Sequence, residues 1–210
     1  MTRYYDIAGG RILIDGQDLS KLTQRSLRKQ VGVVLQEAFL FTDTVMNNLL
    51  YANEDATEED VIEAAKQANA HDFIMGLPEG YNTMLTERGA NLSQGQRQMV
   101  TIARAMVADP KMMILDEATS NVDTRTEKLI QDGMRRLMEG KTSFSIAHRL
   151  ATIRDSSRIM VLNGGEIEEL ASHDDLMAAK GFYYALYMSQ FKGKGPGCDP
   201  EELAIDFIST

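Results

Sequence analysis

Short apolar segments and amphipathic helical patterns alternate along the second half of the chain. An apolar segment over 111–115 follows a helical pattern over 94–108, and a second helical pattern leads to another apolar segment over 142–147. Segments this short are typical of strands, and helices that connect successive strands are typical of a parallel sheet. We therefore predict an α/β fold with a parallel sheet.

The first half of the chain interrupts this alternation. Residues 31–35 form another strand-like apolar segment, but residues 44–108 are mostly helical in pattern, and Thr57 begins one helix with the spacing of a capping box. We predict a helical lobe over about 44–108, inserted into a lobe that continues over about 109–180. Residues 193–210 are rich in glycine and acidic side chains, and we expect a flexible acidic tail there.

Charge and cysteine content exclude several classes of protein. The chain has 31 acidic and 22 basic residues, which gives a net charge of −9. A protein that grips nucleic-acid phosphates needs a net basic face, so nucleic acid is not an expected partner. The single cysteine, Cys198, cannot build a disulfide framework or a cysteine-ligated zinc site, and it favours a reducing compartment. No apolar stretch reaches the length of about 18 residues that a membrane span requires.

Two acidic residues follow the apolar segment in the middle of the chain. Asp116 and Glu117 come directly after it, and ligands of an open parallel sheet bind beyond the carboxyl ends of its strands. Asp116 could hold Mg²⁺, directly or through water, while Glu117 polarises an attacking water molecule. The alternative is an exposed helix start at which acidic side chains favour the helix dipole. The two residues alone leave both interpretations open.

Two further polar residues end predicted strands. His148 lies 31 residues after Glu117, which is enough for one helix and one returning strand, so we expect it at the same sheet edge. It could sense a phosphate there, although a lone histidine is more often a structural residue. Gln36 ends the segment 31–35; its amide could contact both a metal and a water molecule, or simply occupy a turn.

A polar segment over 92–96 precedes a predicted helix. Ser93 is a favourable N-cap, and Gly95 permits close backbone approach at a helix start whose N–H groups attract anions. An ordinary capped helix would use the same residues. The segment by itself therefore predicts a helix start more firmly than a phosphate site.

The order and spacing of these segments resemble the ATP-binding domain of exporter-type ABC transporters. The residues that match its motifs are Gln36 (Q-loop), Ser93, Gly95 and Gln96 (signature), Asp116 (Walker B), Glu117 (catalytic acid), Ala118 to Asp123 (D-loop) and His148 (switch histidine). The resemblance covers about residues 1–192, and residues 86–89 and 39–41 also resemble exporter segments. It implies the α/β, P-loop NTPase fold of the ABC ATPase type, with a mixed, mainly parallel sheet and an inserted helical lobe.

The resemblance also implies a function. It implies an ATP-hydrolysing domain that binds ATP and Mg²⁺ and powers export of a substrate, at the cytoplasmic face of the plasma membrane. Its partners would be a transmembrane domain, which contacts the helical lobe and the region of Gln36, and a second ATP-binding domain in a head-to-tail dimer.

Each matched residue has a role in that family. Gln36 and Asp116 would contact Mg²⁺, Glu117 would act as general base or orient the water, and His148 would contact the γ-phosphate. The signature residues Ser93, Gly95 and Gln96 would close over the partner's ATP, and residues Asn121 to Asp123 would communicate between the two sites.

The sequence departs from the family pattern in two places. Position 94 is Gln where the commonest signature has Gly, and we expect the phosphate contact to survive this change. The phosphate-binding loop Gly-x-x-x-x-Gly-Lys-Ser/Thr is absent. The only Gly-Lys-Thr, at 140–142, has Arg135 in place of the first glycine and leads from a helix to a strand. In the family this Walker A loop precedes the stretch that matches 3–16, so we expect the fold to be incomplete at its N-terminus.

The missing loop predicts weak nucleotide binding. It supplies several charge-assisted hydrogen bonds, each worth about 1.5–3 kcal/mol, so its loss lowers ATP affinity by several decades. We therefore expect no ATP hydrolysis by this chain alone.

A second hypothesis is a catalytically incompetent fragment or partner that contributes only the signature half-site. A third, a soluble ABC-type ATPase of DNA repair or translation, is opposed by the charge, the lack of coiled-coil heptads and residues 86–89.

Overall fold

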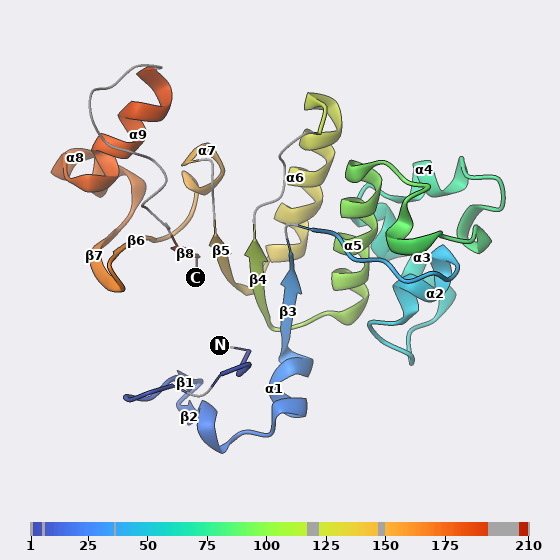
Figure 1. The fold of residues 1–210 in the computed structure, drawn as a ribbon, viewed down its shortest axis with the longest axis horizontal. Helices are drawn as coiled ribbons and strands as arrows, with labels where there is room; N and C mark the ends of the chain where they lie inside the picture. Colours follow the sequence, from blue (N-terminus) through green and yellow to red (C-terminus); the bar gives the residue numbers. More distant parts are fainter. Residues whose placement is uncertain are drawn as a thin grey trace.

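The structure is a computed structural model that describes residues 2–5, 7–35, 37–116, 122–146, 150–192 and 206–209. Its centre is a four-stranded sheet with the order β3-β4-β5-β8 (Figure 1). The strands are β3 (Val31–Val34), β4 (Met112–Asp116), β5 (Thr142–Ile146) and β8 (Asp206–Ser209). The first three run parallel, with Val34 opposite Leu115 and Asp116 opposite Ile146. The predicted α/β fold with a mixed, mainly parallel sheet is confirmed.

The last strand differs from the sequence-based expectation. Residues 193–210 were expected to form a flexible acidic tail, but Asp206–Ser209 form β8, antiparallel to β5. The segment 206–209 contains an aromatic and a β-branched apolar residue between its polar ends, and such residues suit an edge strand. Residues 193–205 lie outside the described part of the chain.

Helices cover one face of the sheet. The long helices α5 (Gln94–Ala108) and α6 (Thr124–Met138) pack on the face to which Met113 and Leu115 point, and both side chains are fully buried there. On the other face, residues of the N-terminal segment pack against Met112 and Ile114. This segment consists of β1 (Leu13–Ile14), β2 (Gln17–Asp18), η1 (Leu19–Lys21) and α1 (Gln24–Gln30). The sheet is therefore the middle layer of three.

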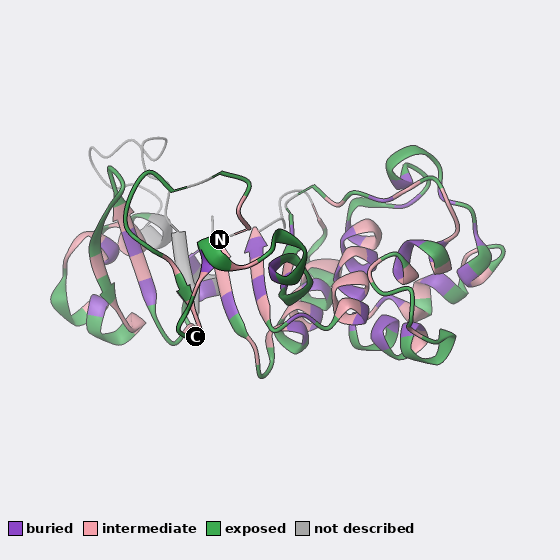
Figure 2. Cartoon of the chain, turned by 90° about the horizontal axis from the view of Figure 1, so that it is seen from below, coloured by how far each residue is buried: buried purple, intermediate pink, exposed green. Residues whose placement is uncertain are grey.

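A group of short helices lies beside α5, away from the sheet (Figure 1). Its members are α2 (Val45–Leu50), α3 (Glu58–Gln67), α4 (His71–Met75), η2 (Gly80–Asn82) and η3 (Glu87–Gly89). The capping box predicted at Thr57 is present, because Thr57 and Asp60 exchange hydrogen bonds at the start of α3. These helices and α5 share one hydrophobic core with the sheet, and buried residues follow the inner faces of the helices (Figure 2).

A separate small core lies at the other end of the molecule (Figure 1). Its centre is the buried Tyr183, whose hydroxyl lies 2.8 Å from Nδ1 of His173. The elements around it are α7 (Leu150–Ile153), β6 (Ile159–Asn163), β7 (Glu166–Ala171), α8 (His173–Ala179) and α9 (Phe182–Lys192). Within the described residues, the helices are all too short or too polar to cross a membrane.

Candidate functional site

The sheet brings three strand ends to one edge. Because β3, β4 and β5 are parallel neighbours, the segments that follow Val34, Asp116 and Ile146 all leave the sheet on the same side. These three strand ends are separated by 82 and 30 residues along the sequence, as their positions show. The register thus places at one edge the last residues of three strands, and the sequence predicts metal-binding and catalytic side chains shortly after each of them.

Four of the predicted residues lie outside the described part of the chain. Gln36 comes two residues after β3, Glu117 directly after β4, and His148 two residues after Ile146 of β5. Asn121 lies in the connection between β4 and α6. Their roles therefore stay predictions, whereas Ser93, Gly95, Gln96, Asp116 and Asp123 can be described.

Asp116 is the last residue of β4, where its side chain is half-buried. A carboxylate at a strand end supplies the hard oxygen ligand that Mg²⁺ prefers, and Mg²⁺ usually keeps several water ligands beside one or two carboxylates. The described residues contain no group of three or more histidine, cysteine or acidic side chains that could hold a metal. Asp116 by itself could supply one oxygen ligand to such an ion.

Ser93 and Gln96 cap the start of α5. Ser93 Oγ accepts a hydrogen bond of 3.2 Å from the Gln96 N–H, and Gln96 Oε1 accepts one of 2.8 Å from the Ser93 N–H. This capping box fixes the first turn of a 15-residue helix, whose dipole favours an anion at this end. Ser93 is exposed, so the start of α5 faces solvent.

Gly95 is the point at which α5 meets the start of α6. Gly95 is buried, and a Cβ atom there would collide with Cγ2 of Thr126 and lie 3.3 Å from Cγ1 of Val122. The sequence indicated a glycine for close approach to a ligand. The structure adds a second reason, because the side chain of Thr126 occupies the space next to this glycine.

Asp123 caps the start of α6. Its Oδ1 accepts hydrogen bonds from the N–H groups of Arg125, at 3.1 Å, and Thr126, at 3.0 Å. Hydrogen bonds from the Thr126 side chain and then from backbone N–H groups hold the pKa of Asp123 below its usual value. Asp123 therefore caps the first turn of α6 as a carboxylate.

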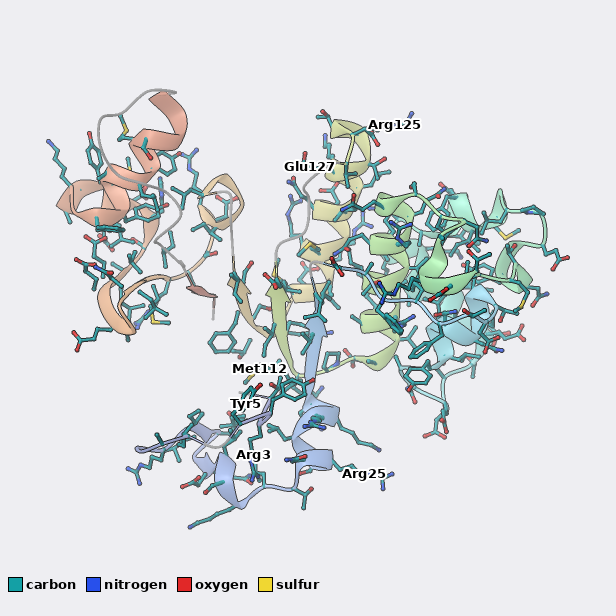
Figure 3. All side chains as sticks on the ribbon, in the orientation of Figure 1. Arg3, Tyr5, Arg25, Met112, Arg125 and Glu127 are labelled. Carbon is teal, nitrogen blue, oxygen red and sulfur yellow. The ribbon has the colours of Figure 1, made fainter. Side chains whose placement is uncertain are left out.

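A cavity of about 410 Å³ lies beside these two helix starts. Its lining includes Ser93 and Gln96 from α5 and Arg125 and Thr126 from α6, and Lys66 adds a second cation. Arg125 lies at the end of α6 that is near the start of α5 (Figure 3). Sequence reasoning missed Lys66 and Arg125, because a charged residue on a helix is usually a solvated surface residue. It missed Thr126, because no sequence pattern pairs this residue with Gly95.

The Gly-Lys-Thr segment at 140–142 leads from a helix to a strand, as the sequence predicted. It connects α6 to β5, whereas a phosphate-binding loop leads from a strand into a helix. Gly140 adopts a positive φ of 71°, as is usual directly after a helix. The ammonium of Lys141 lies 3.0 Å from Oδ1 of Asp109, at the end of the sheet opposite Asp116.

Comparisons with known proteins agree with this geometry. The model of the ABC transporter family matches residues 1–120. The chain is 54% identical over 192 residues to an uncharacterized ABC transporter ATP-binding protein of Bacillus subtilis (strain 168), and 50% identical over 192 residues to an ATP-dependent lipid A-core flippase of Syntrophus aciditrophicus (strain SB). Each match covers 91% of this chain and 32% of the relative, so the chain spans about a third of their length.

A solved structure is similar over nearly the whole chain. It is a bacterial Atm1-family ABC exporter with ATP bound, with a TM-score of 0.84 and 45% sequence identity. The match covers 94% of this chain and 34% of the exporter chain. The sheet and helices described above therefore have the ABC ATPase form of the P-loop NTPase fold.

Proposed function

This chain belongs to the ABC transporter family, and on that premise we propose that it acts within the ATP-hydrolysing domain of an exporter. The observation that supports the proposal is the parallel register of β3, β4 and β5, which brings the strand ends at Val34, Asp116 and Ile146 to one sheet edge. Positioning of this kind is what phosphoryl transfer to water requires, because its catalysis depends mainly on placement and electrostatics.

Each residue at this edge has a defined task in the proposal. Asp116 and Gln36 hold Mg²⁺, which neutralises phosphate charge when it is bound. Glu117 accepts a proton from the attacking water or orients it, and His148 contacts the terminal phosphate. The sequence contains no phosphate-binding loop of the Gly-x-x-x-x-Gly-Lys-Ser/Thr type, so we assign the phosphate cradle to none of its residues.

The start of α5 serves a nucleotide held by a second ATP-binding domain. Ser93 offers a hydroxyl hydrogen while its Oγ accepts from the Gln96 N–H, and the N–H of Gly95 lies in the first turn, where N–H groups attract phosphate. Asp123 caps the neighbouring start of α6, where Thr126 meets Gly95 of α5. In the proposal, the sheet edge and the start of α5 that together enclose one ATP therefore come from two different subunits.

The proposed partner on the membrane side contacts the loop after β3. Phe39 is 52% exposed and Tyr51 is 66% exposed, so aromatic surface is available at this loop and at the end of α2. The flippase relative and the Atm1-family structure are exporters by name. We infer that a transmembrane domain covers this surface, at the cytoplasmic face of the plasma membrane.

A second candidate function is supported by the exposed, capped start of α5. In it, the chain is catalytically incompetent and contributes only Ser93, Gly95 and Gln96 to the ATP of an intact partner domain. The test is to add the chain to an intact ATP-binding domain of the flippase relative. Stimulated ATPase that is lost with Ser93→Arg, but kept with Ser172→Arg at the capped start of α8, would support this candidate.

A chimera tests the first proposal. The matching residues of the flippase relative are replaced by residues 1–192 of this chain, so that the host supplies every other segment. We expect ATP hydrolysis by the purified chimera, with a loss of at least about 100-fold on Glu117→Gln, and no hydrolysis by the 210-residue chain alone. A chimera that reaches the membrane with intact mass but hydrolyses no ATP would overturn the proposal.

A further inference from the structure

Asn48 holds the aromatic loop that follows β3. This side chain of α2 is only 1% exposed, and its Oδ1 accepts a hydrogen bond of 2.9 Å from the N–H of Phe41. Its Nδ2 donates to the carbonyl oxygens of Phe41 and Thr44, both at 3.0 Å. One amide side chain thus satisfies both backbone groups of Phe41, as a neighbouring strand would, and fixes the loop to the start of α2.

Arg104 of α5 ties the same loop to the long helix. Its Nη1 donates to the carbonyl oxygen of Phe39 at 2.9 Å, and its Nη2 donates to Asn48 Oδ1 at 2.8 Å. Its Nε donates to the carbonyl oxygen of Asn48 at 2.8 Å, and the guanidinium lies 5.6 Å from the centre of the Phe41 ring. These contacts join positions 56 to 65 residues apart in sequence.

The acceptors around Arg104 are neutral. Among the described residues it forms no ion pair, and its burial lowers the pKa of its guanidinium. A buried cation is costly unless hydrogen bonds compensate it, and the planar fork of arginine can reach several acceptors at once. A lysine at 104 has a single nitrogen and could not satisfy three acceptors in this geometry. Arg104 therefore serves here as a rigid connector between elements.

Arg104 connects two surfaces that the proposed function uses, which are the aromatic loop after β3 and the start of α5. On the loop side, the Phe41 ring lies 5.2 Å from Phe39 and 4.4 Å from Tyr51, both of which are exposed. On the helix side, α5 runs from Arg104 back to Ser93, a distance of about 16 Å along the axis. Arg97, two turns before Arg104, similarly donates to the carbonyl oxygen of Leu92 at 2.6 Å.

We propose that Arg104 is a positioning residue that makes the aromatic loop 39–41 and helix α5 move as one body, so that displacement of the loop is passed to Ser93. The inference rests on the proposed function, in which a transmembrane domain contacts this loop. It adds the physical connection between that contact and the start of α5. Asn48 completes the connection from the side of α2.

The first test uses the 210-residue chain and needs no ATPase activity. Amide hydrogen exchange at Phe41 reports the bond to Asn48 that Arg104 stabilises. We expect Arg104→Met to accelerate exchange at Phe41 by at least about tenfold, and Arg104→Lys to have an intermediate effect. The matched control is Arg136→Met, because Arg136 also donates to a distant carbonyl oxygen, that of Gln67 at 2.7 Å, on another surface. Unchanged exchange at Phe41 in Arg104→Met would overturn the proposal.

The second test uses the chimera and separates coupling from folding. ATP hydrolysis is measured with and without lipid A-core, the substrate in the host's name. We expect Arg104→Met to bring the ratio of stimulated to basal rate close to one, with KM for ATP changed less than twofold. Arg104→Lys should give an intermediate ratio, and Arg136→Met the original one.

The outcomes distinguish this proposal from the proposed function. An inactive chimera with the original Arg104 overturns the proposed function, while amide exchange still decides whether Arg104 holds the loop. An active chimera in which Arg104→Met keeps the full ratio, or in which Arg136→Met lowers it equally, overturns the coupling role. If Arg104→Met does not accumulate, the graded effect of Arg104→Lys on both readouts decides the question.

Discussion

The start of α5 and the carboxyl edge of the sheet hold their candidate site residues in different ways. At the start of α5, Ser93 and Gln96 fix each other through two hydrogen bonds between residues three positions apart. At the sheet edge, Asp116 is placed by the register of β4 with β3 and β5, which are distant in sequence. The first arrangement is local, whereas the second depends on the packed core of the whole sheet.

The two regions therefore depend on different parts of the molecule in order to form. A capping box is satisfied as soon as one helical turn forms, so it depends little on the rest of the molecule. Three parallel strands need long connections and a core that covers both faces of the sheet. We therefore expect core substitutions to affect the sheet edge most, and substitutions at the junction of α5 and α6 to affect the relation between the two regions.

The largest effect is expected for Leu115→Ala. Leu115 is fully buried on β4 next to Asp116, and truncation of a buried leucine lowers the free energy of unfolding by about 2–5 kcal/mol. Leu13→Ala is the control, because Leu13 is 47% exposed on β1 and its truncation should cost about 0.5 kcal/mol or less. Urea denaturation of the chain measures both. Equal effects would mean that the sheet core is not the stabilising centre described above.

A smaller effect is expected at the junction between the two regions. Gly95→Ala places a methyl group against Cγ2 of Thr126, and overpacking of this kind costs about 1–3 kcal/mol, partly offset by the higher helix propensity of alanine. Thr126→Ser removes the opposing methyl group and keeps a hydroxyl near Asp123. The double variant should therefore regain most of the stability that Gly95→Ala loses, as thermal denaturation would measure.

The double-mutant cycle also distinguishes two reasons for the glycine. If packing against α6 is the reason, the effects of Gly95→Ala and Thr126→Ser are strongly non-additive. Additive effects on stability would show that Thr126 does not confine this position. In the chimera, recovered stability without recovered ATPase would mean that backbone approach to a phosphate also requires Gly95.

Local signals in the sequence predicted part of this site correctly. The helical pattern over 94–108 and the N-cap at Ser93 both match α5. They could be predicted because the capping residues and the residues of the helix period are close together in the sequence. The apolar segment before Asp116 matches β4, and the alternation of strands and helices predicted their parallel arrangement. Each of these features can be read from residues that are close together in the sequence or from the order of neighbouring segments.

Contacts between distant segments could not be read in the same way. No sequence period links Arg104 to Phe39 or Gly95 to Thr126, because these pairs meet only after α5 has packed against α2 and α6. The short helix α1 was not predicted, since Leu27 is its only buried residue and gives no apolar stripe. Strand β8 was also missed, because its partner β5 lies about 60 residues earlier in the sequence.

The smallest effect is expected for Lys141→Met, at the end of the sheet opposite the candidate site. The ammonium of Lys141 lies 3.0 Å from the exposed carboxylate of Asp109, and such a pair contributes about 0.5 kcal/mol or less. A methionine keeps most of the aliphatic chain, which is largely buried. The ATPase rate of the chimera should stay within about twofold, whereas removal of a lysine from a phosphate-binding loop would abolish it.

The pH dependence of stability sharpens this prediction. The hydrogen bond from Lys141, assisted by the charges of Lys141 and Lys111, lowers the pKa of Asp109. A lowered carboxyl pKa contributes stability that is fully present above the pKa of the unfolded chain, about 3.9, and is lost as pH falls through the folded value. Lys141→Met should therefore reduce the loss of stability below about pH 4, measured as unfolding midpoints between about pH 3 and 7. An unchanged pH profile would show that Lys141 does not hold Asp109 in solution. A large loss of ATPase activity would instead mean that the Gly-Lys-Thr segment takes part in the site.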